Sequence, residues 1–70
     1  MNRDAVDSSN LKSVGYDPDS RTLEVEFHHG GIYQYYGVPA QVYESLMNSG
    51  SHGRFLAQRI KGVYRYSKIG

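Results

Sequence analysis

Residues 22–29, TLEVEFHH, alternate apolar and polar side chains with the period of a β-strand. Leu23, Val25 and Phe27 lie on one face of this strand, and the other face is polar. A preceding strand is predicted over 11–17, LKSVGYD, and it stops at the turn-forming sequence DPDSR. Because only one face of the resulting sheet is apolar, the sequence predicts a domain of two layers.

The chain turns at HHGG and returns through IYQYY, residues 32–36, which predicts a second hairpin. The loop length decides which tyrosines face the core, because a shift of one residue exchanges the two faces of a strand. A loop of two or four residues turns Gln34 toward the apolar face, whereas a three-residue loop with a glycine bulge turns Tyr33 and Tyr35 there. We favour the bulged loop, since it leaves the polar Gln34 outside and packs two large aromatic rings against the rest of the domain.

After GVP the apolar residues recur with the period of an α-helix. Pro39 suits the first turn of this helix, and Val42, Leu46 and Met47 follow at helical spacing. Gly50 is expected to close the helix as a C-terminal cap.

A second helix is predicted over 52–61, with Ser51 as its N-cap and Gly62 at its end. At 100° per residue, Leu56 and Ile60 share one side of this helix, which we expect to face the core. The opposite side is polar and basic and carries Arg54, Gln58 and Lys61.

The last segment, VYRYSKI, alternates again and indicates a short extended stretch that either pairs with a sheet edge or remains a loose tail. The sequence therefore predicts an α+β fold, a three-stranded antiparallel β-meander packed against two C-terminal helices, with a short extended C-terminal segment. We expect a single domain over 1–70, with residues 1–7 as a flexible tail. The predicted core consists of Leu23, Val25, Phe27, Val42, Leu46, Leu56 and Ile60.

Composition narrows the class of protein. Seventy residues make one domain, and a chain of this length buries only about 60% of the surface that it exposes when unfolded. There is no cysteine, which excludes disulfides and thiolate chemistry. The polar start of the chain is unlike a signal peptide, and no apolar run approaches the ~20 residues that a membrane span needs. We expect a soluble, cytoplasmic monomer that does not bind membranes.

The formal net charge of +1 conceals an uneven distribution. Residues 1–50 carry three Lys or Arg and seven Asp or Glu, whereas residues 51–70 carry five Lys or Arg and no acid. This asymmetry indicates either an anionic partner for the C-terminal end or an internal balance between the two halves.

The order of these features resembles the KTSC domain, a short bacterial domain found at the C-terminus of some lysyl-tRNA synthetases and as a stand-alone protein. The resemblance spans 6–68. It rests on SSN, VGYD, LEVEFHHGGIYQYYGVP, SHGRF, Ile60 and YRY, and its family motif falls on Tyr33, Tyr35, Val38 and Pro39. The resemblance implies RNA binding, by association with the synthetases.

The polar residues favour no catalytic or metal chemistry. Adjacent strand residues point to opposite faces, so His28 and His29 do not form a ready metal site with His52. Ser8 and Ser9 precede a strand without a nucleophile motif, as turn-forming serines do. We expect no enzyme activity, no metal and no cofactor.

The tyrosines leave two interpretations open. Aromatic faces beside cations suit single-stranded nucleic acid, because bases stack and phosphates release counterions, but tyrosines also line small cores. The leading prediction is a non-catalytic module that binds RNA, such as tRNA, or single-stranded nucleic acid weakly through a C-terminal basic-aromatic surface. The alternative is a protein-interaction module that binds an acidic protein or a second copy of itself. The predicted nucleic-acid contacts are Arg54, Arg59, Lys61, Tyr64, Arg65, Tyr66 and Lys68.

Overall fold

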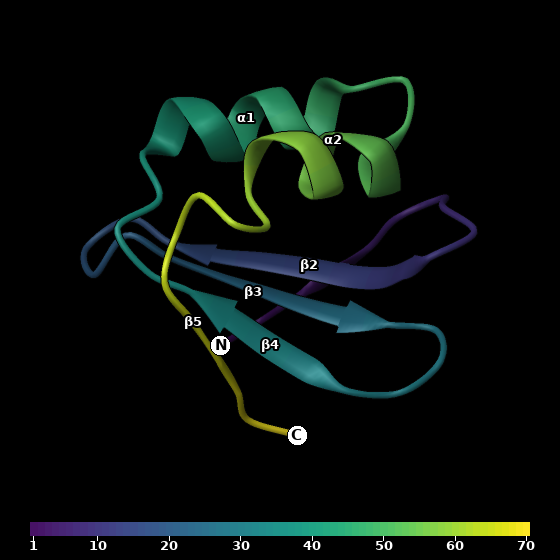
Figure 1. Cartoon of the computed structure of the whole chain (residues 1–70), viewed down its shortest axis with the longest axis horizontal. Coiled ribbons are helices and arrows are strands. Elements are labelled where there is room, and N and C mark those ends of the chain that lie inside the picture. The colour runs from purple at the N-terminus through teal and green to yellow at the C-terminus, as the bar shows by residue number, and fades with distance from the viewer.

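Five antiparallel strands form one sheet in the computed structural model, which describes residues 1–70, and their order in the sheet is their order in the chain. Both helices lie on one side of this sheet (Figure 1). The strands are β1 (Asp4–Ala5), β2 (Leu11–Asp17), β3 (Thr22–Phe27), β4 (Ile32–Tyr35) and β5 (Tyr66–Lys68), and the helices are α1 (Ala40–Asn48) and α2 (His52–Arg59).

The predicted α+β class with two helices on an antiparallel sheet is confirmed, but the predicted count of three strands is wrong. β1 forms within the segment 1–7, where the sequence predicts a tail, and pairs with β2. β5 forms within the extended C-terminal segment and pairs with β4. The two residues of β1 are too few to show an alternating pattern, and the alternation of the last segment leaves open whether it pairs with a sheet edge. Both strands form because a neighbouring strand offers a free edge.

The predicted register of the β3–β4 hairpin is confirmed. Val25 pairs with Tyr33 and Leu23 pairs with Tyr35, so both tyrosines share the helix-facing side of the sheet. The loop holds three residues, 28–30, and is closed by a hydrogen bond from the Phe27 N–H to the Gly31 carbonyl (3.1 Å). Both glycines at its end have positive φ angles of 95° and 94°, which explains why glycine stands there.

The hydrophobic core lies between the sheet and the helices. Of the predicted core residues only Val42 is half-buried, and it packs against the edge of the cluster. The buried cluster consists of Leu11, Val14, Leu23, Val25, Phe27, Tyr35, Val38, Leu46, Leu56 and Ile60.

The helix ends follow local hydrogen bonds. The Ser51 hydroxyl accepts from the Arg54 N–H (3.4 Å), which confirms the predicted N-cap of α2. α1 stops before Gly50, because Ser49 leaves the helical conformation and its hydroxyl donates to the Leu46 carbonyl (2.8 Å). The prediction of Gly50 as the cap is therefore wrong. Neither helix is long and apolar enough to cross a membrane.

The N-terminal segment crosses the helix-free face of the sheet. The Arg3 guanidinium pairs with Glu24, lies 3.5 Å from a Glu26 oxygen and donates to the Ser13 hydroxyl at 3.0 Å. A Cβ atom at Gly15 would lie 2.4 Å from the Asn2 carbonyl oxygen, so the close approach requires glycine. Arg3 thereby holds β1 against the sheet through side chains as well as backbone.

Candidate functional site

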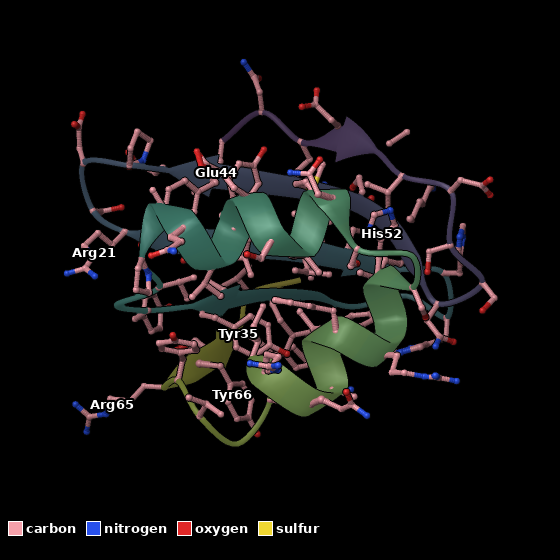
Figure 2. The ribbon with its side chains drawn as sticks, turned by 90° about the horizontal axis from the view of Figure 1, so that it is seen from above. Arg21, Tyr35, Glu44, His52, Arg65 and Tyr66 are labelled. Atoms are coloured by element: carbon pink, nitrogen blue, oxygen red, sulfur yellow. The ribbon has the colours of Figure 1, made fainter.

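A pocket of about 360 Å³ opens where β4 and β5 meet the end of α2, and we call it the aromatic pocket. The hairpin register brings Tyr33 and Tyr35 to the helix side of β4, and β5 places Tyr66 directly opposite Tyr35. Figure 2 shows Tyr35 and Tyr66 close together beside α2. The lining residues are Phe27, His29, Tyr33, Tyr35, Lys61, Gly62 and Tyr66.

The aromatic rings of this pocket form a chain of contacts in space that runs from the core to the surface. Phe27 meets Tyr33 edge to face, with 5.5 Å between ring centroids, and Tyr33 lies 6.0 Å from Tyr66. Tyr35 lies 5.9 Å from Tyr66 on the other side. Tyr35 is 3% exposed and Tyr66 is 61% exposed, so the pocket has a buried wall and an open rim.

Cations and neutral groups surround these rings. The Lys61 Nζ atom lies 5.2 Å from the centroid of the Phe27 ring, within the range of a cation–π contact. Lys68 pairs with Tyr33 across the strands. Its side chain reaches Gly31, where an added Cβ atom would lie 3.5 Å from the Lys68 Cε atom. No acidic residue lines the aromatic pocket. A ligand there would meet flat apolar faces and positive charge.

The Tyr35 hydroxyl is held in its neutral form. Burial raises the pKa of Tyr35 above its ordinary value of 10.0, and the neighbouring Tyr33 and Tyr66 raise it further. The phenol therefore adds no negative charge to the pocket near neutral pH.

The structure brings together only some of the predicted nucleic-acid contacts. Lys61 and Tyr66 line the aromatic pocket with Tyr33 and Tyr35 of the family motif, and Lys68 pairs with Tyr33 but lies outside that lining. The three predicted arginines are exposed and lie outside this lining: Arg54, Arg59 and Arg65. Arg65 points away from Tyr35 and Tyr66 (Figure 2). Tyr64 is half-buried and packs against the core.

Three lining residues, Phe27, His29 and Gly62, are not among the predicted site residues, and Gly62 is predicted only as the end of the second helix. Phe27 was assigned only to the core, and His29 only to a turn. The structure stacks His29 on Phe27, with 5.3 Å between centroids and 15° between planes. The predicted hairpin register could have identified Phe27 as a wall of the pocket, because the register that turns Tyr33 inward also places Phe27 beside it.

The other two motif residues have structural roles. Val38 is fully buried, and its carbonyl accepts a 2.6 Å hydrogen bond from the Tyr16 hydroxyl. Pro39 precedes the first residue of α1 in an extended conformation. These two residues fix the turn from β4 into α1 and lie outside the pocket lining.

The serines and histidines near the chain's polar turns contact the backbone. The Ser8 hydroxyl accepts from the N–H groups of Asn10 and Leu11 at 3.2 Å each. One ring nitrogen of His28 lies 2.9 Å from the Ser8 carbonyl, and one of His52 lies 2.8 Å from the Leu46 carbonyl. No three His, Asp or Glu side chains gather as a metal site would require.

Comparison with known proteins shows which family this chain is similar to. The model of the KTSC domain matches residues 7–66. An uncharacterized protein of Stutzerimonas stutzeri is 46% identical over 70 residues, covering 99% of each chain. A crystal structure of a KTSC domain protein from Yersinia pestis matches with a TM-score of 0.96 and 46% identity, over 99% of this chain and 97% of that one.

A longer relative carries the same segment. A lysine–tRNA ligase of a Nostoc species is 38% identical over 63 residues, which are 90% of this chain. The chain spans only 11% of the length of that ligase. The chain belongs to the KTSC domain family.

Proposed function

We propose that this KTSC domain is a non-catalytic module that binds single-stranded RNA weakly in the cytoplasm, with one base in the aromatic pocket. The observation that carries the proposal is the arrangement of Tyr66, a residue that is 61% exposed at the rim of a pocket lined by Lys61 and by no acid. An exposed aromatic face next to a cation is the basic unit of single-strand recognition.

We give the stacking role in this proposal to Tyr66, and the exposure of the rings supports this choice. A base needs an accessible face, and Tyr66 offers one while Tyr35 is buried behind it. Tyr33 is half-buried and touches both Tyr66 and Phe27, so it supports the rim. Stacking on an aromatic side chain contributes about 1 to 3 kcal/mol per base, which suits a weak and sequence-tolerant interaction.

The charge supports RNA and limits the affinity. Lys61 and Lys68 stand beside the rings and can each contact a phosphate. Since only these two cations stand beside the rings, few counterions are released on binding, and the net charge of +1 adds little general attraction, so the affinity stays modest. The relatives named lysine–tRNA ligase act on an RNA substrate, and their KTSC segments are compatible with a role near RNA.

The experiment is a titration of single-stranded RNA, tRNA and duplex DNA into the wild type and Tyr66→Ala at several salt concentrations. Tyr66→Ala should weaken single-stranded RNA binding by about 1 to 3 kcal/mol, roughly 5- to 150-fold, because it removes the exposed ring. Its melting midpoint should stay within a few degrees of the wild type, since Tyr66 is mostly exposed.

Arg65→Gln is the matched control, because Arg65 adjoins Tyr66 in the chain and points away from the pocket (Figure 2). It should bind RNA nearly as the wild type does. A wild type that ignores every RNA but captures an acidic peptide would replace this proposal with the protein-interaction alternative.

A further inference from the structure

The aromatic pocket continues into a second hollow of about 220 Å³ on the other side of Lys61. The two spaces share three wall residues, Phe27, His29 and Lys61, so they are two parts of one groove along α2. The second hollow runs on to Asn10, Gly53 and Ala57.

The walls of the second hollow differ from those of the aromatic pocket. It contains no tyrosine, and its aromatic rings are the shared Phe27 and His29, which stack on each other. Its polar groups are the Asn10 amide, the His29 ring and the Lys61 ammonium, and no acid lines it. Such a surface suits a sugar and a phosphate better than a second stacked base.

Glycine at position 53 is a structural requirement of this hollow. A Cβ atom there would lie 2.8 Å from the Asn10 side-chain nitrogen, so Gly53 lets the amide lie against the first turn of α2. The close approach sets the amide at the far end of the groove from the tyrosines. The groove is thus aromatic at one end and cationic in the middle, and at the other end the Asn10 amide lies beside the apolar Leu11, Leu56 and Ala57.

We infer that the second hollow is a subsite for the sugar–phosphate backbone of the RNA strand whose base occupies the aromatic pocket. This inference rests on the proposed function. Lys61 stands at the junction of the two spaces, where the phosphate next to the stacked base would lie. The footprint on the protein is therefore longer than one nucleotide, and it runs along α2 toward Asn10.

Ala57 and its neighbour provide a matched test. Ala57 is exposed and lines the second hollow, whereas Gln58 is exposed and lies outside both parts of the groove. Ala57→Glu should weaken binding of a tetraadenylate RNA about five-fold or more, and Ala57→Lys should strengthen it, because the two charges act oppositely on a phosphate. Gln58→Glu and Gln58→Lys should each stay within about two-fold of the wild type. A packing defect would shift both Ala57 variants in the same direction.

Amide chemical shifts show the footprint directly. Adenosine, which has no phosphate, should shift signals around Tyr33 and Tyr66 only, whereas the tetraadenylate should also shift those of Gly53 and Ala57. If Tyr66→Ala loses RNA binding while Ala57→Glu equals Gln58→Glu, the second subsite is refuted and the proposed function stands. If the wild type binds neither adenosine nor the tetraadenylate, both are refuted.

Discussion

The depth of each tyrosine in the aromatic pocket decides what its ring can contribute. Tyr35 is sealed by the sheet and the helices, so its ring is part of the core as well as the pocket wall. Tyr66 contributes little to the core and offers its face to a ligand. We therefore expect two tyrosines directly opposite each other on adjacent strands to have separate roles, Tyr35 in stability and Tyr66 in the proposed binding.

Truncation should separate these two roles. Tyr35→Ala should lower the free energy of unfolding by about 3 to 5 kcal/mol, as large-to-small changes of buried aromatic residues do. That loss is comparable with the roughly 3 to 5 kcal/mol that a core of this size supplies, so the variant should be largely unfolded. Tyr35→Phe keeps the ring and should remain folded. Thermal melting followed by circular dichroism measures both, and an unchanged midpoint in Tyr35→Ala would contradict the core role.

The orientation of Tyr33 and Tyr35 could be predicted from the sequence, because the polar Gln34 between them favours the face of the strand away from the core. It did not reach the pocket, which depends on the pairing of Tyr66 with Tyr35 across thirty residues of chain. No local pattern fixes such a pairing, since either edge of the sheet could accept a short extended segment.

At the scale of elements, side-chain contacts hold β1 to the sheet, because a strand so short forms few backbone hydrogen bonds. It has two residues, both exposed, and Arg3 next to it supplies the contacts to Glu24 and Glu26. Glu24 is 5% exposed, and burial opposes its ionisation. Hydrogen bonds from Gln34 and Arg3 outweigh that burial, so the pKa of Glu24 lies below its ordinary value of 4.5.

Acid should therefore weaken the attachment of β1. A carboxyl group whose pKa is lower in the folded protein stabilises it above the unfolded pKa, and this stability is lost as the pH falls through the folded value. The melting midpoint of the wild type should fall as the pH drops below 4.5, and that of Glu24→Gln should start lower and fall less. Asp17, whose pKa is also lowered, chiefly by the Ser20 hydrogen bond, keeps part of the dependence in both proteins. Parallel curves for the two proteins would rule out this role of Glu24.

The long elements and the hairpin strand β4 were predictable, whereas β1 and the pairing of β5 were not. Repeated apolar spacing over six or more residues predicts β2, β3 and both helices, and the observed bounds of these elements lie close to the predicted ones. β1 depends on Arg3 finding two glutamates on another strand and on the absence of a side chain at Gly15. These contacts join distant parts of the chain, so only the folded structure shows them.

At the scale of the whole molecule, the basic C-terminal residues do not form one surface. Of the cations on α2 and the turn after it, Lys61 alone lines the groove. Arg54 borders a separate hollow near the start of α2. The uneven charge distribution indicates either an anionic partner or an internal balance, and the fold leaves only part of the C-terminal charge near the candidate site.

The salt dependence of binding should follow this division. Lys61→Gln should reduce the slope of log affinity against log salt by about 1, as expected for the loss of one phosphate contact. The double variant Arg54→Gln, Arg59→Gln removes more charge but should leave that slope almost unchanged. Both should keep the wild-type stability within about 0.5 kcal/mol, since all three side chains are exposed. An equal flattening in both would indicate binding by general attraction to the C-terminal end.

The position of β5 in the chain also determines when the candidate site can first exist. β5 is the last strand of the sheet to be synthesised, and until residues 66–68 are added β4 remains an open edge that carries two aromatic side chains. A nascent or truncated chain would therefore contain most of the core but neither the outer wall of the aromatic pocket nor the strand that covers its edge. We expect translation that ends early in this stretch to yield a domain that lacks Tyr66, the ring proposed to stack on a base, and that exposes the edge of β4 to other unfinished chains.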